Sequence, residues 1–175
     1  FAEGAGFDTG DRELRGAVAV RPGPRGFGLV NEVGLEEYLY GAVSAALPRQ
    51  SDSEAYKAQS VVSRTRALWF KAHPGAGFAG ADLCDSDACQ RYLGLSEEIQ
   101  AATAAVRETA GVTLTLDGAP ALALAHDACG GVTEDGRAAQ APGAEALVSV
   151  PDGEQPAAVG ATPGELELWT HEYPP

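Results

Sequence analysis

The sequence predicts a mixed α+β fold, in which helices pack on a mainly antiparallel sheet within a single domain that carries a substrate groove. Two observations lead to this prediction. Three segments have apolar residues at helical spacing and end at a proline or a glycine, and two pairs of strand-like segments are joined by turn residues. A chain of 175 residues is long enough for one sizeable core that does not depend on disulfides.

The N-terminal part of the chain predicts a flexible segment followed by a hairpin. Residues 1–13 are polar and rich in glycine, so we expect them to be flexible. The segments LRGAVAV, residues 14–20, and FGLVNEV, residues 27–33, have the composition of strands. The turn residues RPGPRG between them favour an antiparallel hairpin.

Two helices separated by Pro48 are predicted next. The segment GLEEYLYGAVSAAL has apolar residues at helical spacing and ends just before this proline. The following helix covers residues 51–73, with Ser51 or Ser53 as its N-cap. Pro74 and a run of glycines stop it.

The segment SEEIQAATAAVRETAG predicts a third helix, with Ser96 at its N-cap and Gly111 just past its end. The segments VTLTL and APALALAH, joined by Asp-Gly, predict a second hairpin. The C-terminal part has little periodicity and is expected to wrap the domain as a loop anchored by Trp169. The predicted organisation is a flexible segment at 1–13, a domain at 14–137 and a loop-rich extension at 138–175.

The charge of the chain restricts its partners. Twelve basic and 25 acidic residues give a net charge of −13, which excludes a nucleic-acid partner because phosphate binding needs clustered Lys and Arg. An anionic membrane surface is disfavoured for the same reason. A neutral polymer such as a sugar strand remains compatible with this charge. No apolar run approaches the ~20 residues of a membrane span.

Lys57 and Arg64 are seven residues apart on the predicted 51–73 helix, so they share one face. One interpretation is a solvated basic edge. The other is a binding surface, because basic residues are scarce and the polar residues Gln59, Ser60 and Ser63 nearby can hydrogen-bond a sugar.

Cys84 and Cys89 allow three interpretations. A disulfide between them suits an oxidising compartment and ranks first. A zinc site ranks second, because it needs about four Cys or His ligands and the three histidines are distant in sequence. Two free thiols are the third. Since the chain has three cysteines, at most one disulfide forms within it, and the remaining cysteine is a free thiol or a ligand.

The segment HDACGG, residues 126–131, follows a predicted strand. His126 and Cys129 allow a Cys–His nucleophile hypothesis, although both side chains are equally compatible with partial burial. The two glycines indicate a sharp turn or the close approach of a ligand.

In combination, the segments NEVGLEEYLYGAV, ALP, EAYKAQSVVSRTRAL, DLCDSDACQRYLG and AVRETAGVTLTLDGAPALALAHDACGG resemble the SpoIID/LytB family of bacterial cell-wall proteins. The resemblance covers about residues 31–135. It implies an extracytoplasmic protein that acts on peptidoglycan, either secreted or anchored through a segment outside this chain. The chain starts without Met, so we expect a processed or cut chain. Sporulation members of the family are lytic transglycosylases that cut the MurNAc–GlcNAc bond of strands lacking stem peptides and leave 1,6-anhydro ends.

The resemblance also implies site residues. The acid/base Glu of the family precedes a Met-Pro pair, and this position is Ala46 here. Lys57 and Arg64 fall on the positions beside that Glu. Further positions of the family pattern, which the resemblance assigns to substrate binding, are Gln59, Thr65, Gln90, Tyr92, His126, Cys129, Gly130 and Gly131. Some relatives bind zinc in the cysteine loop with a His that is Ala88 here, so no cofactor is expected, with zinc at Cys84 and Cys89 as the alternative.

Three functional hypotheses follow. The first is a glycan-binding protein that does not cut, acting as a scaffold or as an activator of another cell-wall hydrolase. Proton donation to a leaving sugar oxygen contributes ~10²–10⁴-fold to the rate, and Ala46 cannot supply it. The second is a lytic transglycosylase in which Ala46 is engineered or another acid compensates. The third is a thiol enzyme based on Cys129.

Overall fold

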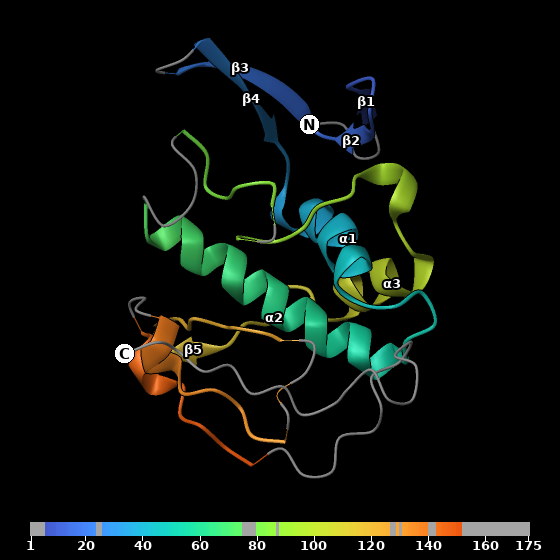
Figure 1. The fold of residues 1–175 in the computed structure, drawn as a ribbon. Coiled ribbons are helices and arrows are strands. Elements are labelled where there is room, and N and C mark those ends of the chain that lie inside the picture. Colours follow the sequence, from blue (N-terminus) through green and yellow to red (C-terminus); the bar gives the residue numbers. More distant parts are fainter. Residues whose placement is uncertain are drawn as a thin grey trace. The chain divides into compact units, whose positions relative to one another are not determined.

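The computed structural model describes residues 6–23, 26–74, 80–86, 88–126, 129, 131–139 and 143–151 (Figure 1). The chain divides into two compact units, Phe1–Ala123 and Leu124–Pro175, and each is described by itself. Three α-helices and antiparallel strand pairs among the described residues confirm the mixed α+β fold class. The elements are β1 (Gly6–Asp8), β2 (Glu13–Arg15), β3 (Ala17–Gly23), β4 (Gly26–Glu32), α1 (Leu35–Ala46), α2 (Ser53–Ala72), α3 (Gln100–Glu108), β5 (Thr115–Leu116) and β6 (Ala119–Pro120), with 3-10 helices at Leu95–Glu97, Gly136–Ala139 and Ala144–Ala146.

The strands of the first unit form separate two-stranded sheets. β1 lies within the N-terminal segment that the sequence predicted to be flexible, and it pairs with β2, which begins at the last residue of that segment. β3 and β4 form the predicted hairpin, from Ala17 opposite Glu32 to Gly23 opposite Gly26. Gly16 precedes β3 with a φ of +82°, and a Cβ there would lie 2.2 Å from the Glu32 carbonyl oxygen. Only glycine fits this close approach of two backbones.

The core of the first unit is where α1, α2 and α3 pack together, as Figure 1 shows. α1 contributes Leu39 and Val43, α2 contributes Tyr56, and α3 contributes Ala105 and Val106. The small alanine side chains of α3 let the helices approach closely around the larger side chains of α1 and α2. Apolar burial in this cluster is the main stabilising contribution to the arrangement.

The N-cap of α2 is Asp52, and neither serine that the sequence offered takes this role. The Asp52 carboxylate accepts a hydrogen bond from the Glu54 N–H at 2.8 Å. A carboxylate at this position also interacts favourably with the positive end of the helix. The helix ends at Ala72, close to the predicted stop before Pro74.

The prediction that Ser96 caps the third helix is wrong, because Ser96 lies inside the 3-10 helix Leu95–Glu97. α3 begins later, at Gln100. Two tertiary contacts keep the residues before it extended. Glu98 accepts two hydrogen bonds from Arg15 of β2, and the Ile99 N–H donates to the Ser44 hydroxyl of α1 at 2.9 Å.

The second predicted hairpin is present as the short pair β5–β6. Asp117 and Gly118 occupy its turn with φ angles of 51° and 81°, which is the left-handed backbone that favours Asp-Gly. The segment before β5 is tied to α2, because the Leu114 N–H donates to the Thr65 hydroxyl at 2.9 Å.

In the second unit, an isolated bridge pairs Val132 with Pro151. Gly136 is buried, and its N–H donates to the Leu147 carbonyl oxygen at 2.7 Å. The C-terminal extension beyond residue 151, with its predicted anchor Trp169, lies outside the described residues. Within the described part of the chain, no helix has the length and apolarity needed to cross a membrane.

Candidate functional site

Ala46 is the last residue of α1, and it is exposed. The next residue, Leu47, is extended, so the helix stops at Pro48 as the sequence predicted. The Tyr56 hydroxyl of α2 donates a hydrogen bond to the Pro48 carbonyl oxygen at 2.7 Å. This bond fixes the joint between the two helices, and the position of Ala46 with it.

Lys57 lies in the first turns of α2 between two carboxylates. Its ammonium group is 2.8 Å from the Glu54 carboxylate and 2.9 Å from the Glu108 carboxylate at the end of α3. Hydrogen bonds to these two groups raise the pKa of Lys57 above its usual range. Its side chain is 31% exposed, so solvent still reaches the cluster.

Arg64 is buried among the three helices, with 1% of its side chain exposed. Its Nε and Nη2 atoms each donate to Glu36 of α1 at 2.8 Å, the bidentate geometry typical of strong Arg–carboxylate pairs. The remaining donors reach the carbonyl oxygens of Ser60, Val106 and Val112 at 3.1–3.4 Å. Arg64 therefore does not lie on a solvated edge, and its donors are engaged within the fold.

Thr65 is also buried, and its hydroxyl links two segments. It donates to the Val61 carbonyl oxygen at 2.6 Å and accepts from the Leu114 N–H. Lys57, Arg64 and Thr65 thus make contacts that connect α2 to α3 and to residues 112–114.

A different face of α2 carries a polar cluster, which we call the Gln90 cluster. Gln90 accepts a hydrogen bond from the Tyr38 hydroxyl of α1 at 3.0 Å and donates to the Ser63 carbonyl oxygen at 2.8 Å. The Gln59 amide donates to the Ser63 hydroxyl at 3.0 Å. The Tyr92 ring lies 5.2 Å from the Tyr38 ring. Tyr38, Gln59, Ser63, Gln90 and Tyr92 make up this cluster.

Burial perturbs the hydroxyl groups of both tyrosines of the cluster. Burial raises the pKa of Tyr38, and the positive charge of Arg66 opposes this change only in part. Burial also raises the pKa of Tyr92, and the side chain of Asn31 opposes this change in part. The Tyr92 ring packs against Gly41 of α1, where a Cβ would lie 2.6 Å from the ring. A glycine in the middle of α1 therefore makes room for the cluster.

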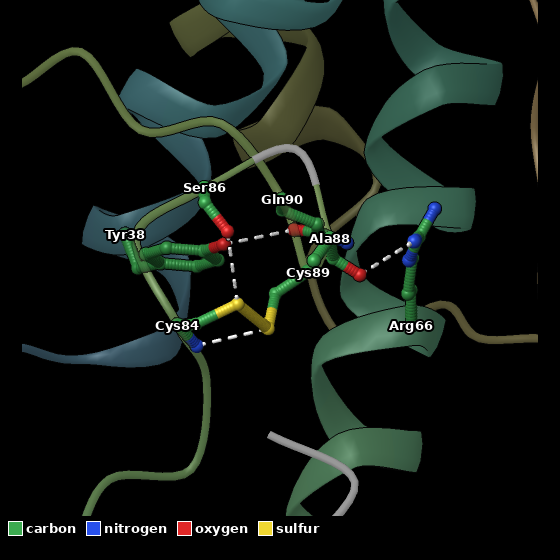
Figure 2. The surroundings of a disulfide bond; sticks show 7 residues. All are labelled: Tyr38, Arg66, Cys84, Ser86, Ala88, Cys89 and Gln90. Carbon is green, nitrogen blue, oxygen red and sulfur yellow. Dashed lines mark hydrogen bonds between the residues drawn. A yellow bond between two sulfur atoms is a disulfide. The ribbon is translucent and has the colours of Figure 1, made fainter. Parts of the chain in front are cut away.

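Figure 2 shows the loop that carries Gln90 and a disulfide between Cys84 and Cys89. The Cys84 N–H donates to the Cys89 sulfur at 2.9 Å, and the Cys84 sulfur lies 3.3 Å from the Ser86 hydroxyl. The disulfide closes a short ring beside α2 and holds Ala88 and Gln90 against that helix. Within the described residues, no group of three or more His, Cys, Asp or Glu side chains is placed to hold a metal ion.

The HDACGG segment belongs to the second unit. His126 is exposed and Cys129 is half-buried, and Gly131 has a φ of +95°, consistent with the turn that the glycines predicted. Gly130 lies outside the described residues. The predicted groove from Lys57 and Arg64 to this segment remains a prediction, and so do the substrate-binding roles of its residues.

The structure adds Glu36, Tyr38 and Arg66, which the sequence analysis did not single out as site residues. Glu36 is the partner of Arg64, and Tyr38 is the partner of Gln90. Gln59, Ser63 and Arg66 follow one another at spacings of four and three residues, which places them on one stripe of α2. That spacing was available in the sequence, but only the loop packed against the stripe shows that it faces a polar cluster.

A family model for SpoIID, stage II sporulation protein, matches residues 24–116, which is more than half of the chain. The chain belongs to the SpoIID family. The matched region contains Ala46, all of α2 and the disulfide loop, whereas HDACGG lies beyond it. Membership marks this SpoIID chain as a sporulation- or cell-wall-related protein. Comparison with curated proteins and with solved structures found no significant match.

Proposed function

We propose that this SpoIID protein binds peptidoglycan glycan strands and does not cleave them. The observation that carries the proposal is the exposed Ala46 at the end of α1, where the resemblance to lytic transglycosylases requires an acid. A methyl group cannot donate a proton to a leaving sugar oxygen. Lys57 and Arg64, the cations expected to assist that acid, are engaged by Glu54, Glu108 and Glu36.

The Gln90 cluster supports the binding part of the proposal. Its half-buried members Tyr38, Gln59 and Gln90 offer a hydroxyl group, amide groups and an aromatic ring, a combination that suits the polar groups and apolar faces of a sugar. The net charge of −13 disfavours a densely charged polyanion such as nucleic acid. The disulfide fits the oxidising surroundings of an extracytoplasmic protein. In this role the protein acts as a scaffold or as an activator of another cell-wall hydrolase.

A second candidate is a lytic transglycosylase that uses a different acid. The carboxylates of Glu54 and Glu108 favour it, because they lie within 2.9 Å of Lys57. Both accept hydrogen bonds from the Lys57 ammonium, which occupies them as acceptors and not as proton donors. Non-cleaving binding therefore remains the first proposal.

Co-sedimentation with insoluble glycan strands tests the binding proposal. Strands freed of stem peptides are incubated with the wild-type protein and with the Gln59→Ala variant. We expect the wild type to sediment with the strands and Gln59→Ala to sediment less. Gln50→Ala is the matched control, because Gln50 is an exposed glutamine between α1 and α2, outside the cluster. If the wild type stays in the supernatant at all strand concentrations, the proposal fails.

A further inference from the structure

Arg66 is the basic residue of the α2 stripe that faces the disulfide loop. Its Nη2 atom approaches the Ala88 carbonyl oxygen at 3.5 Å, a long contact, and Figure 2 shows the side chain lying beside that loop. Its guanidinium carbon lies 5.8 Å from the centre of the Phe70 ring. Its Nε atom is buried and makes no hydrogen bond. The aromatic ring and the loop therefore hold a guanidinium group whose donors are largely unused.

No carboxylate pairs with Arg66 in the described part of the chain. Ion pairs to carboxylates are made by Arg12, Arg15, Arg21, Arg49, Arg64 and Arg137. Among the described residues, Arg66 is thus a half-buried cation without a carboxylate partner.

A half-buried cation of this kind lowers the stability of the folded protein until an anion pairs with it. Burial lowers the pKa of Arg66, which means that its charged form has lost part of its hydration. A partly dehydrated guanidinium group with a buried unused N–H gains from a planar oxyanion, which can accept two parallel hydrogen bonds. The fork of Arg suits carboxylates in particular.

The neighbours of Arg66 indicate what carries this anion. The charges of Asp85 and Arg66 both act on the Tyr38 hydroxyl, so Arg66 and the Gln90 cluster lie in one electrostatic neighbourhood. Asp85 is already paired with Arg12, and the cluster itself contributes amide and hydroxyl groups. A polar surface with a cation that no described carboxylate pairs suits a sugar chain with isolated carboxylates.

We propose that Arg66 is an anion subsite that binds the lactyl carboxylate of N-acetylmuramic acid. This inference rests on the proposed glycan binding and specifies which strands are preferred. In strands without stem peptides the lactyl carboxylate is free and charged. In strands that carry stem peptides the same carboxyl group is an amide, which cannot accept a charge-assisted pair from Arg66.

Calorimetric titration with two soluble oligosaccharides tests the subsite. One is a tetrasaccharide of alternating N-acetylglucosamine and N-acetylmuramic acid, and the other is neutral chitotetraose. We expect the wild type to bind the first about tenfold more tightly, the size typical of one charge-assisted pair. Arg66→Gln removes this preference and leaves the affinity for chitotetraose unchanged. High salt reduces the preference of the wild type.

Arg91→Gln is the matched control, because Arg91 is an exposed arginine of the same loop. It keeps the tenfold preference. Equal affinity of the wild type for both oligosaccharides overturns the proposal. An equal loss of both affinities in Arg66→Gln also overturns it, because that result indicates a purely structural role.

A titration of the Arg66 Nε–H nuclear magnetic resonance signal with D-lactate separates this proposal from glycan binding. A saturable shift of that signal with D-lactate, absent with chitotetraose, supports the subsite. If both oligosaccharides fail to bind while this shift occurs, only the proposed function is overturned. No shift with D-lactate overturns the subsite. A shift with inorganic phosphate but not with D-lactate overturns the assignment to a carboxylate. Asp87 is the sequence neighbour of Ala88, so its carboxylate is the acid of this chain that could compete for Arg66. If an Asp87→Asn variant binds D-lactate more tightly than the wild type, Asp87 is the group that pairs with Arg66, and the assignment to a ligand carboxylate is overturned.

Discussion

At the scale of single residues, Arg64 joins the three helices of the first unit. Its guanidinium group bonds to Glu36 of α1 and to carbonyl oxygens of α2, of α3 and of residue Val112. A buried cation of this kind is costly without a carboxylate partner, since it has given up its hydration. The Glu36 carboxylate therefore stabilises the place where the helices meet.

Glu36→Gln is expected to lower the free energy of unfolding by about 2 kcal/mol, measured by urea denaturation. Removing one partner of a fully buried pair typically costs about 3–5 kcal/mol, and the value is reduced here because Glu36 is 36% exposed. Glu37→Gln is the matched control in the same helical turn, and we expect a change below about 0.5 kcal/mol. Equal effects of the two substitutions would show that the Arg64 pair contributes no stability.

The raised pKa of Lys57 leads to a prediction about how the stability of the protein depends on pH. Its folded-state pKa is raised by Glu54 and Glu108. The stabilisation from these contacts is therefore fully present below the ordinary lysine pKa of about 10.4, and it is lost as the pH rises through the higher folded value. The only other lysine, Lys71, is exposed on the last turn of the same helix.

At about pH 10, we expect an amine-reactive reagent to modify Lys71 faster than Lys57, as measured by mass spectrometry of peptides. The protonated amine is unreactive, and Lys57 holds its proton to higher pH. In a Glu54→Gln, Glu108→Gln double variant the two rates should become similar. Comparable rates in the wild-type protein would contradict the ion pairs.

At the scale of elements, the Cys84–Cys89 ring fixes the loop that carries Ala88 and Gln90. Replacing both cysteines by alanine is expected to lower the free energy of unfolding by roughly 2 kcal/mol, the chain-entropy value for a loop of this size. Hydrogen exchange should increase in the loop and change little in α3. Intact mass without reductant should correspond to one disulfide, and a mass with three free thiols would contradict it.

The elements themselves were largely predictable from local signals. Pro48 marks the end of α1, and Asp117 with Gly118 marks the β5–β6 turn, because each of these residues restricts its own backbone. The start of α3 was not predictable from Ser96. It is set by Ser44 and Arg15, which come from other elements, and contacts of that kind leave no local pattern in the sequence.

The candidate site was predictable to a similar extent. Ala46 stands out because the resemblance places the acid of the family at this position, although the residues beside it also depart from the family pattern. The spacing of Lys57 and Arg64 correctly placed them on one face of α2, but it did not show that Glu36, Glu54 and Glu108 engage them. Arg66 was not singled out from the sequence, because only the three-dimensional surroundings show that no carboxylate among the described residues pairs with it.

At the scale of the whole molecule, the SpoIID chain combines a family scaffold with Ala46 at the position where the resemblance predicts an acid. The helices, the joint at Pro48 and the disulfide loop are all formed, so Ala46 lies on an ordered scaffold. We propose that such a protein retains a surface that contacts a glycan strand and lacks the group that would cut it.

Mass spectrometry of glycan strands tests this account most directly. Strands without stem peptides are incubated with the wild type, with Ala46→Glu and with Ala45→Glu as the matched control, and the products are searched for 1,6-anhydro ends. We predict none with the wild type or with Ala45→Glu, although the wild type binds the strands, and we predict such ends with Ala46→Glu. Anhydro ends released by the wild-type protein would contradict the account.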